Sequence, residues 1–261
     1  MSLTSLRSLS RALLVPLALG GAGLAASLPA QAAHPLITDD TGTQGTGHWQ
    51  FELNTDQTRV RDEDGTSTHT QAVNATLTRG ITDTLDLAMN LPYQHLRTDG
   101  DDAVSGVGDI TAQAKWRFHE AGNWSFALKP AVTLPSGNAS KGLGTGRSTQ
   151  ALSLIGQYQN GPWTWLTNAG ATHYDNNQGL RTGLWSASTA VLYAPSERWS
   201  FAADVGASRN PDATGPSTLS YALAGAIYHW GKNVDLDVGY RQSLQSGPIE
   251  RTLGAGVTMR W

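Results

Sequence analysis

The sequence contains no cysteine, and beyond its N-terminus it has no apolar run long enough to cross a membrane as a helix. The absence of cysteine excludes disulfides, zinc–thiolate sites and an N-terminal lipid on cysteine. Positive charge is also scarce, because 18 Lys and Arg face 21 Asp and Glu and the basic residues form no run. These deficits argue against a helical membrane protein and against nucleic acid as a partner.

The N-terminus has the pattern of a secretory signal. Arg7 and Arg11 frame the start of an apolar stretch over residues 12–26, and Ala30-Gln31-Ala32 has the small-residue pattern of a cleavage site. We expect residues 1–32 to be a signal peptide rather than a transmembrane helix, because the apolar core is short. Residues 33–46 are polar, rich in Gly and Thr and without periodicity, so we expect either a periplasmic tether or a lumen plug.

From Gly47 onward the chain alternates apolar and polar residues with a period of two, which is typical of strands. Each alternating segment has about the length that a tilted strand needs to cross a bilayer. The fold class predicted for residues 47–261 is all-β, a transmembrane antiparallel up-and-down β-barrel of about twelve strands. The predicted strands are 47–58, 68–79, 84–96, 108–119, 123–134, 148–159, 162–174, 183–194, 198–209, 218–230, 233–244 and 250–261.

Short and long connections alternate between these strands. The short ones are residues 80–83, 121–122, 160–161, 195–197 and 231–232. The longer ones are residues 59–67, 97–107, 136–147, 175–182 and 210–217, with a shorter one at residues 246–249. This alternation and the even strand number are what outer-membrane barrels show, with short periplasmic turns and longer extracellular loops. The location predicted is therefore the outer membrane of a Gram-negative cell.

Aromatic residues gather beside the short connections. Trp116 and Phe118 precede residues 121–122, and Trp124 and Phe126 follow them. Amphipathic rings favour the headgroup region, so we interpret them as the periplasmic girdle of a barrel whose apolar faces meet outer-membrane lipids. A soluble β-sandwich with an aromatic core is the alternative. It explains neither the signal sequence nor the apolar faces on nearly every strand.

The last segment, residues 250–261, places Leu253, Val257, Met259 and Trp261 on one face. The apolar face of a terminal strand can meet lipid if the strand closes a barrel, so we expect this strand to pair with residues 47–58. A strand that ends on an aromatic residue also resembles the signal read by the outer-membrane assembly machinery, which we expect as a partner.

Matching of faces and turns predicts register in three hairpins. Apolar residues should meet outside the barrel, and acids should meet bases inside it. The predicted opposite pairs include Trp116 with Phe126, Leu87 with Trp116, Asp86 with Arg117, Gln113 with Lys129, Asp235 with Arg260, and Val234 with Trp261.

The alternation also assigns charged residues to the lumen. Lys115, Arg117 and Lys129 should form a positive wall that faces a negative wall on the other side of the ring. Such walls either select solutes by charge or only lock the interior together with salt bridges, and the sequence leaves both alternatives open. The lumen-lining residues predicted to govern selectivity are Glu52, Asp86, Lys115, Arg117, Lys129, Asp204, Asp235, Asp237, Arg241 and Arg260.

Three stretches carry a family resemblance: His34–Leu53 (HPLITDDTGTQGTGHWQFEL), Gly106–Phe118 (GVGDITAQAKWRF) and Leu128–Gly137 (LKPAVTLPSG). Together they resemble the outer-membrane transporter family named after the meta-pathway of phenol degradation. The resemblance implies an outer-membrane β-barrel that passes small compounds, including aromatic ones. The family name reflects genetic context, and no residue of this sequence picks out an aromatic ligand.

The function expected is a narrow channel for passive or facilitated diffusion of small polar or aromatic solutes. No phosphate-binding GxxxxGK[ST] motif supplies an energy source, and we expect no cofactor, no metal and no catalytic residue. One alternative is a barrel hydrolase, although no GxSxG motif occurs. Its candidate residues are His69, His95 and His173, with Ser67, Ser105 and Asp175 near them in sequence.

The other alternative is a structural or adhesive barrel whose function lies in its loops. The loops are short for adhesion, at about ten residues. Residues 99–102 contain three acids that could attract a divalent cation, but such a run is usually a solvated loop tip.

Overall fold

A computed structural model describes residues 34–61, 65–100, 102–176, 179–246 and 248–261. The predicted signal peptide, residues 1–32, lies outside these residues. Within the described ranges, no helix has the length and the apolar content to cross a membrane.

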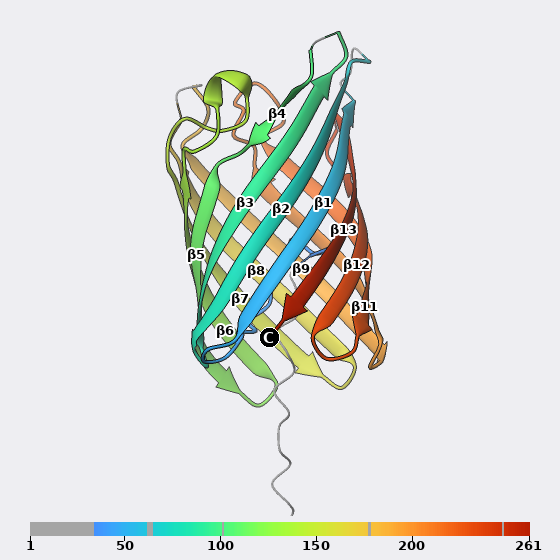
Figure 1. The fold of residues 1–261 in the computed structure, drawn as a ribbon. Coiled ribbons are helices and arrows are strands. Elements are labelled where there is room, and N and C mark those ends of the chain that lie inside the picture. Colours follow the sequence, from blue (N-terminus) through green and yellow to red (C-terminus); the bar gives the residue numbers. More distant parts are fainter. Residues whose placement is uncertain (1–33, 62–64, 101, 177–178, 247) are drawn as a thin grey trace, which may run out of the picture.

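The described residues form thirteen antiparallel strands and one turn of 3-10 helix, η1 (Ala139–Lys141), as Figure 1 shows. The strands are β1 (Trp49–Arg61), β2 (Ser67–Thr82), β3 (Leu85–Thr98), β4 (Val104–Val107), β5 (Ile110–Ala121), β6 (Trp124–Leu134), β7 (Thr149–Asn160), β8 (Trp163–Tyr174), β9 (Gly183–Ser196), β10 (Trp199–Arg209), β11 (Thr218–Trp230), β12 (Val234–Ser243) and β13 (Ile249–Arg260).

Each long strand pairs with its neighbours in sequence, and β1 pairs with β13 to close the ring. The predicted barrel fold is therefore confirmed, and the strand boundaries lie within three residues of those expected. The end that carries the short turns is called the turn end below, and the end that carries the long connections is called the loop end. Both Trp49 and the C-terminus lie at the turn end.

The one unexpected strand, β4, lies in the segment predicted as a loop over residues 97–107. It pairs with the last part of β3, while β5 pairs with the first part of β3. The side chain of Asp109, between the two, turns away to accept hydrogen bonds from the amides of Gly137 (2.9 Å) and Thr145 (2.7 Å). The strand is interrupted there because Asp109 organises the neighbouring long connection.

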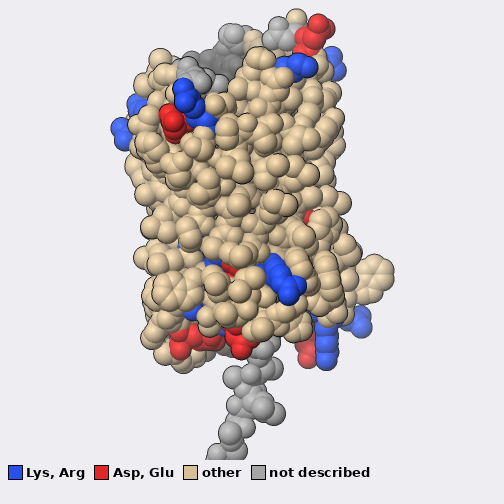
Figure 2. All heavy atoms as spheres, turned by 60° about the vertical axis from the view of Figure 1, so that its left-hand side comes forward, with Lys and Arg blue, Asp and Glu red and all other residues tan. Residues whose placement is uncertain are grey.

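The outer surface carries an apolar belt. Large apolar side chains such as Leu87, Met89, Leu152 and Val238 are exposed on it. On the face shown in Figure 2, charged side chains gather toward the two ends and the middle is largely free of them. Such a belt is what a lipid-facing barrel presents.

The aromatic girdle forms at the turn end as expected. Its rings make contacts from strand to strand along β5 to β9 and again from β10 to β11. The rings concerned are Trp116, Phe118, Phe126, Trp124, Tyr158, Trp165, Trp163 and Tyr193, then Phe201, Trp199 and Tyr228.

The three predicted registers are wrong by two residues. Trp116 lies opposite Leu128 and Leu85, Asp86 lies opposite Lys115, and Asp235 lies opposite Thr258. A shift of two residues keeps every side chain on its predicted face, so the pattern of faces alone does not fix the register. In β5 the register also shifts between Arg117 and His119, which marks a bulge.

Two details at the C-terminus follow from this shift. Met259, rather than Trp261, lies opposite Val234, and the backbone of Trp261 exchanges hydrogen bonds with Trp49 at 2.9 and 3.1 Å. The predicted ion pair between Asp235 and Arg260 nevertheless forms, because the long Arg260 side chain reaches diagonally to within 2.8 Å.

The apolar core of the molecule is a small cluster inside the barrel. It unites inward residues of β8 to β11 with Leu36 from the chain before β1. The strands β8 and β11 are those whose faces are hardest to assign from the sequence, because they are apolar on both sides. The cluster consists of Leu36, Leu166, Ala190, Leu192, Ala202, Leu223 and Ile227, with Tyr221 against it.

Candidate functional site: a lumen crossed by its own N-terminal segment

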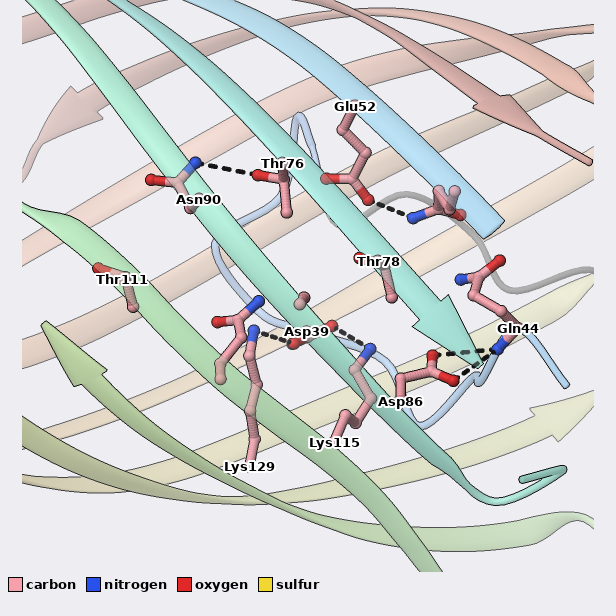
Figure 3. A pocket seen from close by; sticks show the side chains of 13 residues that line it. Asp39, Gln44, Glu52, Thr76, Thr78, Asp86, Asn90, Thr111, Lys115 and Lys129 are labelled. Atoms are coloured by element: carbon pink, nitrogen blue, oxygen red, sulfur yellow. Dashed lines mark hydrogen bonds and ion pairs between the residues drawn. The ribbon is translucent and has the colours of Figure 1, made fainter. Parts of the chain in front are cut away.

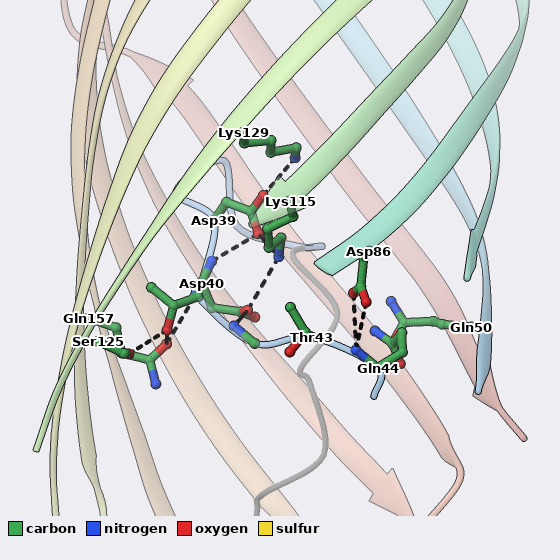
Figure 4. A network of polar contacts seen from close by, with 12 residues as sticks. Asp39, Asp40, Thr43, Gln44, Gln50, Asp86, Lys115, Ser125, Lys129 and Gln157 are labelled. Atoms are coloured by element: carbon green, nitrogen blue, oxygen red, sulfur yellow. Dashed lines mark hydrogen bonds and ion pairs between the residues drawn. The ribbon is translucent and has the colours of Figure 1, made fainter. Parts of the chain in front are cut away.

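Residues 34–46, called the internal segment below, lie inside the barrel (Figure 4). The side chains of Thr38, Asp39, Asp40 and Thr41 are buried there without regular secondary structure. The polar partners of the whole segment, His34 and Gln44 included, come from the inward faces of strands all around the ring: β1, β3, β5, β6, β7, β9, β10 and β12.

The segment enters the lumen at the turn end. The amide of Gln44 donates to both carboxylate oxygens of Asp86, at 3.0 and 3.1 Å. Here the chain passes so close to β2 that a Cβ at Gly80 would lie 1.8 Å from the carbonyl oxygen of Gly45. Only glycine fits at position 80, so this contact fixes where the segment leaves the barrel wall.

Two lysines on one side of the lumen hold the segment by charge. The Nζ of Lys115 lies 2.9 Å from Asp39 and 3.4 Å from Asp40, and the Nζ of Lys129 lies 2.6 Å from Asp39. Burial by itself would raise the pKa of Asp39, but the two ammonium groups outweigh it and hold that pKa below its usual range. Asp39 is therefore a carboxylate, and its charge offsets the lysines.

On the opposite side, Asp204 of β10 holds the backbone of the segment. Its carboxylate accepts hydrogen bonds from the amides of Ile37 and Thr38 and from the Thr38 hydroxyl, each at 2.8 Å, and from the Tyr221 hydroxyl at 3.0 Å. Asp204 is 1% exposed, so these four donors replace the water that a buried carboxylate would otherwise need.

The first residues of the segment fit a third site, on β11 to β13 and β1. His34 forms ion pairs with Asp237 and, at 3.6 Å, with Asp56. Burial alone would lower the pKa of His34, but these two carboxylates raise it to about 9. Pro35 packs where β11 and β12 carry inward glycines, since a Cβ at Gly225 or Gly239 would lie 2.5 Å from its ring.

Two cavities lie beside the internal segment, one on each side of it. The first, of about 300 Å³, adjoins β1, β2, β3, β5 and β6 and is polar (Figure 3). The second, of about 380 Å³, opens toward the loop end and is lined by Ser153, Ser186 and Tyr221 among others. Asp39 lines the first cavity and Ile37 lines the second, so residues 37–39 border both.

A chain of hydrogen bonds crosses the closing strands at the turn end. It runs from Ser200 to His229 (2.9 Å), Asp235 (2.7 Å), Arg260 (2.8 Å) and Gln50 (2.8 Å). Its first three members have the order of a hydrolase triad. However, Ser200 is 1% exposed and lines neither lumen cavity among the described residues, and Asp235 is also engaged by Arg260. The chain therefore links β10 to β1 across the closure of the barrel.

The predicted lumen residues lie in five different settings. Those that contact the internal segment are Asp86, Lys115, Lys129, Asp204 and Asp237. Asp235 and Arg260 belong to the chain across the closing strands, and Glu52, bonded by Gln50, lines the polar cavity. Arg241 pairs with Glu250 (2.7 Å) in the cavity of the loop end, whereas Arg117 pairs with Glu120 (3.1 Å) at the turn end.

The hydrolase candidates are not assembled into a site. His95 lies 2.6 Å from the hydroxyl of Ser105, both exposed. Within the described ranges, no carboxylate contacts His69, His95 or His173, so the group that would orient a catalytic imidazole is missing there. The described ranges also contain no group of three or more His, Cys, Asp or Glu arranged to bind a metal ion.

The comparisons with known proteins agree with this architecture. Residues 37–261 match the model of the family described as "MetA-pathway of phenol degradation". No curated protein matches the chain. A crystal structure of an outer membrane channel from Pseudomonas putida F1 is similar, with 19% identity, a TM-score of 0.70, and 85% of this chain and 98% of that chain covered.

Two further solved structures share the fold. They are the NanC porin (9% identity, TM-score 0.59, 79% and 98% covered) and the translocator domain of the autotransporter NalP from Neisseria meningitidis (15% identity, TM-score 0.55, 85% and 91% covered). At these identities the likeness concerns the barrel alone, and a porin and an autotransporter translocator already have different roles.

Proposed function

The chain belongs to this family, and we propose that it is an outer-membrane channel through which small polar or aromatic solutes diffuse passively. The turn end faces the periplasm and the loop end faces outside. The signal peptide directs secretion, and the C-terminal strand ending in Trp261 is read by the assembly machinery. The lipid-facing apolar belt and the girdle at the turn end support this orientation.

One observation carries the proposal: buried residues of the internal segment lie inside the lumen and border both a cavity at the loop end and a polar cavity that reaches toward the turn end. A solute that moves from one cavity to the other passes beside residues 37–39. Of the two roles expected for residues 33–46, this supports the plug. The plug sets the narrowest point of the channel, and its displacement sets the rate of passage.

The residues that line the two cavities support a preference by charge and polarity among small solutes. In the polar cavity, the carboxylates of Asp39, Glu52 and Asp86 face the ammonium groups of Lys115 and Lys129. Because carboxyl groups stand among the ammonium groups, the cavity is not a uniformly positive wall, which favours neutral polar solutes over anions. In the other cavity, hydroxyl groups and the ring of Tyr221 suit polar and aromatic compounds alike.

Planar-bilayer recording tests the proposal. The folded wild-type protein should show small, solute-dependent conductance. A variant that joins residue 33 directly to Thr46 should conduct several times more, since the segment no longer occupies the lumen. A loop variant that replaces residues 139–141 with glycines serves as the control and should leave conductance unchanged. Folded wild-type and deletion proteins that both fail to conduct would refute a channel function.

A further inference from the structure

The outer face of the barrel carries four basic side chains in one lateral row at the loop end. Arg59 lies directly opposite Arg251 on one side and His69 on the other, and His69 lies opposite Arg97. These residues, called the basic row below, belong to β13, β1, β2 and β3, which lie side by side at the front of Figure 1. All four are exposed.

The basic row points outward, away from the lumen. On β1, Arg59 shares its face with the exposed Leu53, whereas Gln50, on the other face, is buried. Arg59 follows Trp49 by ten residues. At about 3.3 Å per residue and a tilt of about 40°, this places Arg59 about 25 Å above Trp49 at the turn end, and 25 Å is the usual height of the apolar belt. Arg59, within the basic row, therefore lies at the level of the outer headgroups.

The positive charges of the basic row lack an anionic partner among the described residues. Like charges placed directly opposite on neighbouring strands are destabilising, and here Arg59 faces Arg251. Within the described part of the chain, Arg59 donates to the Ser67 hydroxyl (3.3 Å) and none of the three guanidinium groups has an ion pair. Asp99, the carboxylate among the described residues that line the same hollow, accepts the Ser67 amide. An anion that bridges the row would relieve the repulsion.

The basic row lines a hollow of about 700 Å³. The other residues of this hollow are partly polar and partly apolar, so the hollow suits an amphiphilic ligand. Gln57, Gln71 and His95 form the next row toward the belt. Tyr240 and Leu253, which are 45% and 59% exposed, form its apolar border. The hollow thus offers the N–H donors of the basic row at the loop end and apolar side chains nearer the belt. It lies on a wall that faces the membrane rather than the lumen.

We propose that the basic row binds the phosphorylated headgroup of an outer-leaflet glycolipid, with acyl chains against Tyr240 and Leu253. Arg guanidinium groups bind phosphate oxygens in pairs of parallel hydrogen bonds, and a row across four strands spans about 14 Å, enough for more than one phosphate. A free phosphate ion would use the same donors but would gain nothing from the apolar border. The site rests on the proposed membrane location and is independent of what passes through the lumen.

Binding of lipid A to the detergent-solubilised, folded protein tests this site. Wild type should bind bisphosphorylated lipid A at least about tenfold more tightly than dephosphorylated lipid A, because charge-assisted bonds are lost with the phosphates. The triple variant R59Q/R97Q/R251Q should lose this preference. R209Q is the matched control, since Arg209 is exposed at the same height on β10 but stands outside the row.

Other outcomes are decisive as well. Equal binding of the two lipids by wild type, an unchanged preference in the triple variant, or equal stabilisation by inorganic phosphate at the same concentration would each overturn the proposal. The lipid comparison on wild type needs no variant, and single R59Q replaces the triple variant if that one fails to fold. Channel conductance should be the same in R59Q/R97Q/R251Q and wild type, so failure here and failure of the channel proposal are distinguishable.

Discussion

The two sides of the lumen hold the same segment by different interactions. On the β5 and β6 side, Lys115 and Lys129 bind the side chain of Asp39 and leave a polar cavity beside it. On the β8 to β11 side, an apolar cluster packs around Leu36, and the buried Asp204 binds backbone amides. The β5 and β6 side holds the segment by charge, whereas the β8 to β11 side packs around Leu36 and opens into the second cavity only toward the loop end.

This difference assigns the two sides different roles: one side positions the internal segment, and the other allows solutes to pass it. A packed apolar wall gives a segment a defined place, because dispersion contacts are lost with small displacements. A charged wall beside a cavity of about 300 Å³ tolerates exchange, because another ion or a solute can replace the partner. We therefore expect the contacts on the β1 to β6 side to give way when a solute passes residues 37–39, while the β8 to β11 side keeps the internal segment in register.

Breaking the charged side should have the largest effect. In K115M/K129M, the buried Asp39 carboxylate loses both cations, which destabilises the seated segment by about 3–5 kcal/mol. Since the chain has no cysteine, a single T38C in each background reports release of the segment through its rate of thiol labelling. R241M is the control, because Arg241 is an inward cation that pairs with Glu250 instead. Equal labelling of T38C in all backgrounds would show that charge does not hold the segment.

Weakening the packed side should have a smaller effect. L36A removes a buried side chain from the apolar cluster and should destabilise the seated segment by about 2 kcal/mol, the lower end for such truncations, since water can fill the space. Labelling of T38C measures this too. I37A makes the same kind of change at a neighbour that is 43% exposed, so it should have little effect. Larger effects of I37A than of L36A would contradict the assigned core.

A third effect should come from pH, which acts on one end of the segment while Asp39 and Asp204 stay in place. The pKa of His34 is raised to about 9 by Asp237 and Asp56, although burial opposes this. Its stabilisation is complete below the unfolded pKa of about 6.5 and is lost as pH rises through 9. Labelling of T38C, relative to a free thiol, should increase from pH 7 to pH 10. H34Q should abolish this increase, and an increase that persists in H34Q would assign it to another group.

Most of the fold follows from a period of two in the sequence. Strand positions and outward faces are right because lipid on one side and a lumen on the other impose the same alternation on β5, β6 and β13. Registers are not encoded in that alternation. A shift of two residues preserves every face, and the bulge near Phe118 depends on contacts between strands.

The sequence predicts the strand residues of the candidate site but not their partners. The inward charges of Lys115, Lys129 and Asp204 follow from alternation, but their partners lie in a segment without periodicity. A signal did exist: Asp39 and Asp40 supply the acids that the positive wall lacks, and the inward Gly225 and Gly239 leave space for Pro35. Charge balance and missing side chains, rather than periodicity, identify the internal segment.

The position of the internal segment is tested most directly by a disulfide. The Thr38 and Ser188 hydroxyl oxygens are 2.8 Å apart, so T38C/S188C should form a disulfide in the assembled barrel, with no native thiol to compete. T38C/T111C, which pairs Thr38 with the β5 side, should not. The account predicts low conductance in oxidised T38C/S188C and wild-type conductance after reduction. Absence of the disulfide in folded T38C/S188C, or a disulfide without effect on conductance, would contradict it.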